Sequence, residues 1–181
     1  LRGEVNEMTR PALDLSIELA ARMVALSNIE PSLEAARASV LRALESGAAF
    51  ELFRTDVEAQ GGDARVCDNP ASLIPLTLHV VDVESPRAGY VARIDAAEIG
   101  HAVGAMGGGR VRVEDLIDPA VGFLTEAKIG DKLAEGDPLG VLYCRSESQA
   151  AEAAARIRAS YQITDEVPYD SPALIKEVIT A

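Results

Sequence analysis

The sequence predicts an α+β protein built as two units, a helical one over residues 1–72 and a mixed one over residues 73–181. Two observations support this prediction. Apolar side chains recur at helical spacing in the first third of the chain, whereas later segments show the alternation typical of strands. Between them lies a turn-rich connector at residues 63–72 with Asp68-Asn69-Pro70 at its centre, which marks the expected boundary.

Three helices are expected in the first unit. Their predicted ranges are 9–27, 31–46 and 48–60, with Gly47 as a left-handed cap between the last two. Each helix has a stripe of Leu, Ile, Val or Phe on one face, which is typical of a face that is buried against neighbouring helices. These stripes predict packing and no chemistry.

The second unit is expected to mix strands and helices. Strands are predicted at residues 76–83, 90–94, 110–113, 122–127, 139–145 and 161–167. Helices are predicted at residues 96–106, 146–160 and 173–179. Asp95 is the expected cap of the first of these helices. Segments 83–95 and 122–139 have the pattern of two halves of one small folded-over sheet.

The charge of the chain argues against two classes of partner. Its 29 acidic and 17 basic residues give a net charge of −12, so nucleic acids and anionic membranes would be repelled. No apolar run approaches the roughly 20 residues that span a bilayer, and no signal segment opens the chain. We therefore expect a cytoplasmic protein without nucleic-acid or membrane partners. Its first residues, Leu1-Arg2-Gly3-Glu4, predict a chain cut from a longer one.

The residue types that most often carry chemistry are scattered. Cys67 and Cys144 lie outside any CxxC pair, and His79 and His101 show no HExxH-type spacing. We expect free thiols and structural roles for the histidines. No catalytic, cofactor-binding or metal-ligating residue, and no cofactor, is predicted within these 181 residues.

Gly104-Ala105-Met106-Gly107-Gly108-Gly109-Arg110 could be interpreted as a phosphate loop, because glycines let backbone amides approach an anion that Arg110 could pair with. In such a loop the glycines precede a helix. Here they follow the predicted helix 96–106, where the helix dipole is negative. A helix terminator with a tight backbone crossing is therefore the favoured interpretation.

Asp115 and Asp118 could hold a cation together with backbone carbonyls. Their Asp-x-x-Asp-Pro context is typical of a turn, and a structural pairing with Arg110 or Arg112 is favoured.

Six short elements of the second unit resemble a known family in sequence and order. They are Ala88-Gly89-Tyr90-Val91, Asp95-Ala96-Ala97-Glu98-Ile99-Gly100, Gly107-Gly108-Gly109-Arg110, Ile117-Asp118-Pro119-Ala120-Val121-Gly122, Lys128-Ile129-Gly130-Asp131 and Gly136-Asp137-Pro138-Leu139. Together they resemble the C-terminal domain of the thymidine and pyrimidine-nucleoside phosphorylases. The resemblance implies an α/β-hammerhead or barrel-sandwich-like domain over residues 73–181. It also implies that residues 1–72 end a larger α/β domain of the glycosyltransferase type.

Residues 130–139 also resemble the turns of the biotinyl and lipoyl carrier fold. A carrier needs a lysine at the tip of a hairpin to attach its cofactor. The segment in the place of that hairpin, residues 95–118, contains no lysine. This second resemblance therefore supports a sandwich-like fold and argues against a swinging-arm carrier.

The family resemblance implies a function for a longer parent enzyme. Its reaction is the reversible phosphorolysis of thymidine or uridine to the free pyrimidine and a pentose 1-phosphate. In the family, the phosphate loop, the residues that grip the pyrimidine and the dimer helices lie N-terminal to the region present here. The parent is therefore expected to be a homodimer that binds phosphate and a pyrimidine nucleoside, and the fragment itself to be inactive and to support the fold and domain closure.

Two alternatives stay open at this point. The parent could be a related nucleoside-monophosphate phosphorylase, which would accept a 5′-phosphorylated substrate. The chain could instead be a freestanding interaction module without enzymatic activity.

Overall fold

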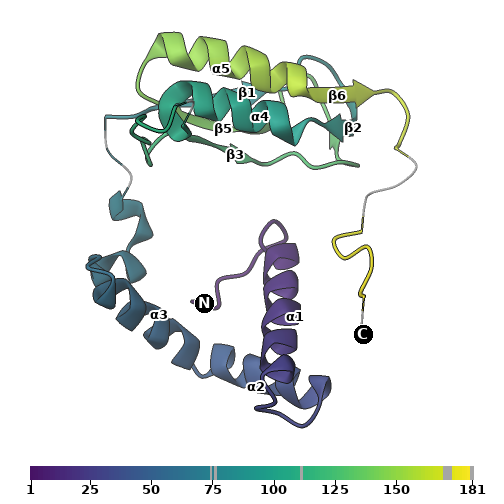
Figure 1. The fold of residues 1–181 in the computed structure, drawn as a ribbon. Helices are drawn as coiled ribbons and strands as arrows, with labels where there is room; N and C mark the ends of the chain where they lie inside the picture. The colour runs from purple at the N-terminus through teal and green to yellow at the C-terminus, as the bar shows by residue number, and fades with distance from the viewer. Residues whose placement is uncertain (74, 76, 111, 169–172, 180–181) are drawn as a thin grey trace. The chain divides into compact units, whose positions relative to one another are not determined.

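The computed structural model describes residues 1–73, 75, 77–110, 112–168 and 173–179 (Figure 1). These residues divide into two compact units, one formed by residues 1–72 with 173–179 and the other by residues 73–168. The assignment of the two units to domains of the resembled family stays a prediction. No described helix is long and apolar enough to cross a bilayer.

The first unit contains three α-helices and a short 3-10 turn, and a second 3-10 turn begins in it and ends at Leu73, the first residue of the second unit. Their bounds are α1 Arg10–Leu26, α2 Leu33–Glu45, α3 Ala48–Ala59, and the 3-10 turns Ala64–Cys67 and Pro70–Leu73. The three predicted helices are thus confirmed, although α2 begins after Pro31, where the Ser32 side chain accepts a hydrogen bond from the Ala35 amide. Helix α1 packs on α2, and α2 contacts α3.

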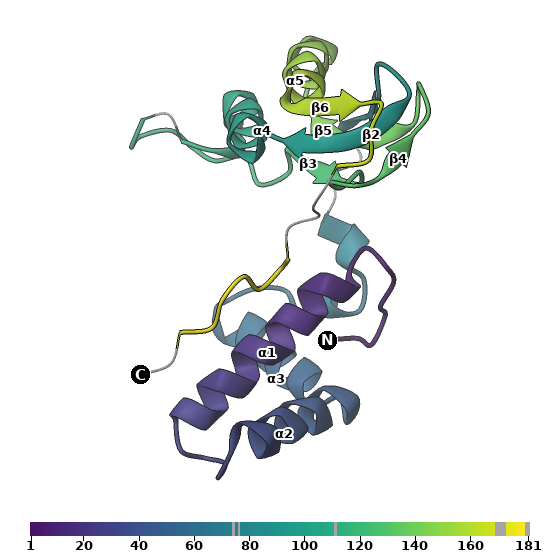
Figure 2. The same cartoon turned by 90° about the vertical axis from the view of Figure 1, so that its right-hand side faces the viewer.

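The second unit contains two antiparallel three-stranded sheets (Figure 2). The first has the order β1-β5-β3, with bounds His79–Glu84, Pro138–Cys144 and Gly122–Thr125. The second has the order β4-β2-β6, with bounds Lys132–Leu133, Gly89–Ile94 and Tyr161–Thr164. The central strand of each sheet is therefore flanked by strands that are distant in sequence.

Two helices complete this unit. Helix α4, Ala96–Val103, follows β2 directly, and the Asp95 side chain accepts a hydrogen bond from the Glu98 amide as the expected cap. Helix α5, Glu147–Ser160, connects β5 of one sheet to β6 of the other. The two helices pack against each other, and α5 also contacts β1 and β5.

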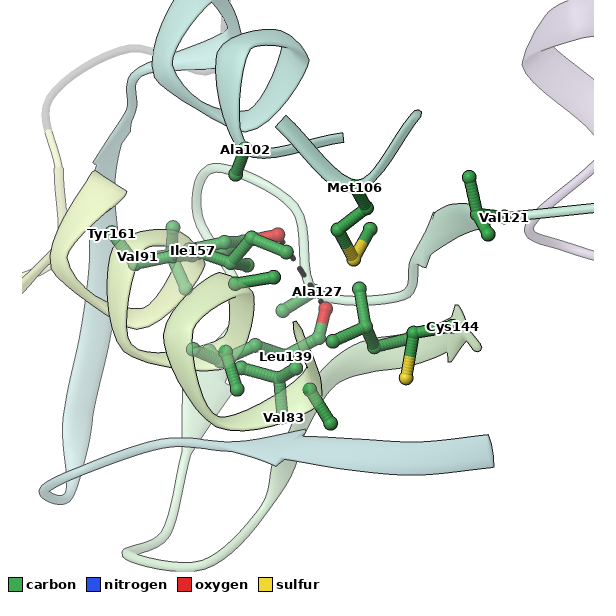
Figure 3. Packing of buried hydrophobic residues seen from close by; sticks show 14 residues of the cluster. Val83, Val91, Ala102, Met106, Val121, Ala127, Leu139, Cys144, Ile157 and Tyr161 are labelled. Atoms are coloured by element: carbon green, nitrogen blue, oxygen red, sulfur yellow. Dashed lines mark hydrogen bonds between the residues drawn. The ribbon is translucent and has the colours of Figure 1, made fainter. Parts of the chain in front are cut away.

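The core of the second unit collects side chains from both sheets and both helices. Figure 3 shows Val83 of β1, Leu139 of β5 and Ile157 of α5 in this cluster, and all three are fully buried. The Tyr161 hydroxyl donates a hydrogen bond to the Leu139 carbonyl at 3.5 Å, which satisfies its polar end inside the core. Burial of each large side chain stabilises the fold by roughly 1.5–3 kcal/mol.

The sheet arrangement differs from the predicted one. Segments 83–95 and 122–139 were expected to form one folded-over sheet, but their strands are divided between two sheets. The two-residue strand β4 was not predicted, because a strand this short shows no alternation in the sequence.

Two predicted elements are absent from the described residues. Residues 110, 112 and 113 form no strand, and residue 111 of that prediction lies outside the described residues. Turn chemistry prevails there, since the Asp115 carboxylate accepts the Arg112 amide at 2.8 Å. Residues 173–179 form no helix, which fits the high cost of nucleating so short a helix.

Smaller differences concern boundaries. The helix predicted to reach Met106 ends at Val103 and continues as a π turn, and the last predicted strand ends at Thr164 rather than Val167. The predicted start of the first strand, residue 76, lies outside the described residues.

Candidate functional site

The glycine-rich segment closes helix α4. Residues Gly104–Gly108 form the π turn, in which Gly107 has a φ of +100°, a conformation that favours glycine. A Cβ on Gly108 would lie 2.7 Å from Val103 Cγ1 and 3.3 Å from Val121 Cγ2. The predicted helix terminator with a tight backbone crossing is thus confirmed.

The same segment presents a carbonyl to its neighbour. The Gly107 carbonyl accepts a hydrogen bond from the Asp118 amide at 2.8 Å. The carbonyl end of a helix carries the negative end of its dipole, which repels anions. This geometry gives no support to the interpretation of the glycines as a phosphate loop.

Asp118 is paired with a residue that the sequence analysis did not name. Its carboxylate accepts two hydrogen bonds from Arg145, at 2.7 Å from Nε and 3.0 Å from Nη2. The predicted pairing of Asp118 with Arg110 or Arg112 was therefore wrong. Arg145 directly follows β5, so the fold brings it to a loop 27 residues earlier in the chain.

Arg145 stabilises the ionised form of the Asp118 carboxyl group. The hydrogen bond from Arg145 is the main reason why the pKa of Asp118 lies below its usual range. Among the described residues, no group of three His, Cys, Asp or Glu side chains is placed to hold a metal ion. A cation site at Asp115 and Asp118 is therefore not supported.

Of the cysteines and histidines, Cys144 and His79 are neighbours, paired across β5 and β1. Cys67 and Cys144 are buried free thiols in different units. The Cys144 thiol lies 3.6 Å from the His79 carbonyl, and burial raises its pKa. His101 is exposed on α4, with Nδ1 3.7 Å from Glu98 Oε2. These positions do not assemble a nucleophile with a base.

Two consecutive turns repeat one hydrogen-bonding pattern. The Asp131 carboxylate accepts the Lys128 amide at 2.7 Å, and the Asp137 carboxylate accepts the Ala134 amide at 2.7 Å. Strand β4 lies between the two turns. Each aspartate satisfies a backbone donor inside its own turn, which indicates a structural role.

The outward face of the β1-β5-β3 sheet is apolar. Directly paired residues of neighbouring strands have their side chains on the same face, and Val81, Leu142 and Phe123 contact the core. The alternate positions therefore face away from it. We call their set the apolar face, formed by Val80, Asp82, Leu124, Val141 and Tyr143.

A groove continues the apolar face along one edge. Its volume is about 440 Å³, and its lining residues include Leu78, Pro119, Phe123, Leu124 and Tyr143. Leu124 and Tyr143 belong to both features. The groove and the apolar face are therefore continuous through these two side chains.

The outward face of the β4-β2-β6 sheet is polar. Val91 and Ile163 form an inward pair, and the outward positions define the polar face, formed by Tyr90, Arg93, Lys132, Gln162 and Thr164. The Lys132 ammonium lies 5.9 Å from the centre of the Tyr90 ring, a cation–π arrangement. The two sheets thus differ in what they offer to their surroundings.

The sequence analysis did not identify the apolar face. A signal was present, because residues 138–144 are apolar almost without interruption, and such runs are typical of strands covered on both faces. Alternation alone could not show which face lacked a cover in the chain.

The second unit is similar to domains of known proteins. Residues 90–164 match the family described as Pyrimidine nucleoside phosphorylase C-terminal domain. Thymidine phosphorylase from Burkholderia cenocepacia strain J2315 is 40% identical over 159 residues, which is 87% of this chain and 36% of that protein. Pyrimidine-nucleoside phosphorylase from Staphylococcus aureus strain bovine RF122 is 37% identical over 167 residues, which is 92% of this chain and 38% of that protein.

The chain therefore spans just over a third of the length of the relatives that it matches. The matched region runs from Tyr90 in β2 to Thr164 at the end of β6. It contains α4, α5 and the strands described for the second unit except β1. The resemblance found in the sequence is confirmed, because residues 90–164 match the pyrimidine nucleoside phosphorylase C-terminal domain.

Proposed function

We propose that the chain is the C-terminal part of a pyrimidine-nucleoside phosphorylase, in which it supports the fold and domain closure. The observation that carries this proposal is 40% identity over 87% of the chain to a thymidine phosphorylase. The parent would convert thymidine or uridine and phosphate into the free base and a pentose 1-phosphate. Its homodimeric state and its cytoplasmic location stay predictions.

The chemistry explains the proposed division of labour. Positive charge develops on the sugar while phosphate attacks, so the enzyme must hold an anion against one face of the sugar. The present chain has a net charge of −12, and its glycine-rich segment presents a carbonyl rather than free amides. The phosphate and pyrimidine sites are therefore assigned to the remaining part of the parent.

The fold supports the same proposal. We assign the second unit to the α/β-hammerhead or barrel-sandwich-like class, because two small sheets share one core and the Asp131 and Asp137 turns repeat. The helices of residues 1–72 would then form the end of the parent's larger α/β domain. Such a unit can complete the wall of that domain without touching substrate.

A chimera tests the proposal. Residues 1–181 would replace the matching part of the Burkholderia cenocepacia thymidine phosphorylase, and phosphate-dependent release of thymine from thymidine would be measured. We expect activity in the chimera and none in the 181-residue chain alone. A folded chimera without phosphorolysis, beside an active parent enzyme, would contradict the proposal.

A truncation tests the supporting role. The same relative would be produced without the segment that matches residues 76–181. We expect both turnover and folding stability to be lost. Steady-state kinetics measures the first and thermal unfolding measures the second. Unchanged turnover would show that the domain contributes nothing to closure.

A further inference from the structure

The apolar face has the composition of a covered surface. Antiparallel sheets that pack on a core with one face commonly present polar residues on the other, as the polar face of the neighbouring sheet does. Val80 is 57% exposed and Leu124 is 48% exposed, although both side chains are of the kind that folding usually buries. The sequence therefore keeps an apolar surface where the described unit does not need one.

The loop before the groove contributes two exposed apolar side chains. Val113 is 85% exposed and Leu116 is 92% exposed, and the chain then continues into Pro119, which lines the groove. The base of this loop is held by the Asp118–Arg145 pair and by the hydrogen bond to Gly107. These two side chains add exposed apolar area beside the groove, although the charged residues Glu114 and Asp115 lie between them in the chain.

We infer that the apolar face and its groove are the contact surface for the remaining two thirds of the phosphorylase polypeptide. This inference rests on the proposed function. The matched relatives are much longer than the matched region, which makes up 36% and 38% of them, so each supplies a large body of chain that can cover the face.

The charge of the chain favours this occupant over two others. The apolar face contains one carboxylate, Asp82, and offers no cations that would attract a nucleic acid or an acidic peptide. Two copies of a chain with a net charge of −12 repel each other, which disfavours a second copy as the cover. A covalently continuous partner needs no attraction to reach the surface, because it is always close.

Thiol labelling tests the inference. Val80→Cys and Leu124→Cys would be made in the 181-residue chain and in the chimera, with Gln162→Cys on the polar face as the matched control. The native thiols are buried and serve as an internal background. Labelling at each cysteine would be followed by peptide mass spectrometry.

We expect all three introduced thiols to react quickly in the isolated chain. In the chimera, the labelling rates of Val80→Cys and Leu124→Cys should be lower by a factor of about ten or more, because a covered thiol reacts only when local opening exposes it. Gln162→Cys should react at the same rate in both. If each of the three cysteines reacted in an active chimera at the same rate as in the isolated chain, the inference would be overturned while the proposed function remained intact.

Two further outcomes are also decisive. Slow labelling of Val80→Cys already in the isolated chain would mean that this chain or a second copy covers the face, which contradicts the inference. Should the chimera fail to fold, cysteines at the aligned positions of the intact Burkholderia enzyme provide the second measurement. Fast labelling there would overturn the inference, and protection would support it.

Discussion

The two sheets of the second unit share one core but differ on their outward faces. The β4-β2-β6 sheet presents Arg93, Lys132 and Gln162, whereas the β1-β5-β3 sheet presents Val80, Leu124 and Val141. Sheets of similar size and the same antiparallel pairing therefore need not have the same surroundings. The polarity of the outward side chains indicates that the first sheet lies between two layers, whereas the second lies at a surface.

The largest expected effect separates the inward and outward faces of the first sheet. Leu142→Ala removes a fully buried side chain and leaves a cavity, so we expect the free energy of unfolding to fall by about 2–5 kcal/mol. Leu124→Ala is the matched control on the outward face and should change it little in the isolated chain. Urea unfolding measures both. Similar losses for the two variants would contradict the assignment of faces.

The second effect concerns the glycines in the two central strands. A Cβ on Gly140 would lie 2.2 Å from the Leu124 carbonyl oxygen, and one on Gly89 would lie 2.5 Å from the Thr164 carbonyl oxygen. Because backbone must move, Gly140→Ala and Gly89→Ala should each destabilise by about 1–3 kcal/mol. Gly100→Ala on α4 meets no atom within 4 Å and serves as the control in thermal unfolding. An unchanged unfolding temperature for either variant would mean that this glycine lies farther from the neighbouring strand than the structure shows.

The third effect is a pH dependence at the end of β5, the central strand of the first sheet. The pKa of Asp118 is lowered by Arg145, so the pair stabilises the fold above the unfolded pKa of about 4 and is lost as the pH falls through the lower folded value. Arg145→Gln should therefore reduce stability at neutral pH and flatten its decline in acid. Urea midpoints between neutral and acidic pH measure this.

A double-mutant cycle provides the control for that pair. Asp118→Asn should reproduce the effect of Arg145→Gln, and the double variant should add little to either. Additive losses would mean that the two side chains act separately, against the bidentate geometry described.

The smallest effect on stability is expected for variants that make the apolar face more polar or the polar face more apolar. Val80→Thr on the apolar face and Gln162→Val on the polar face should each change the free energy of unfolding by less than about 0.5 kcal/mol. Their effects on self-association should be opposite, since the first removes and the second adds exposed apolar area. Sedimentation velocity of the isolated chain measures this, and identical behaviour would weaken the comparison of the faces.

Much of the fold could be predicted because local patterns decide it. The helices α1 to α3, the Asp95 cap and the strand around Val91 are properties of short segments, and the structure contains all of them. The burial expected of the apolar stripes is only partly found, because α3 has no buried residue and Phe53 is 45% exposed. The strand predicted at 110–113 failed because the Asp115 side chain competes for the backbone amide of Arg112. The helix predicted at 173–179 failed because periodicity in a short segment does not offset the cost of nucleation.

The sequence by itself determined the family, the order of most helices and strands, and the closing of α4 by glycine. Only the tertiary structure decided that the strands divide into two sheets, that Arg145 rather than Arg110 or Arg112 pairs with Asp118, and that Val80, Leu124 and Tyr143 share one face. The physical reason is distance along the chain. Caps and periodicity act over a few residues, whereas strand register and ion pairs join segments tens of residues apart, and no local pattern specifies those partners.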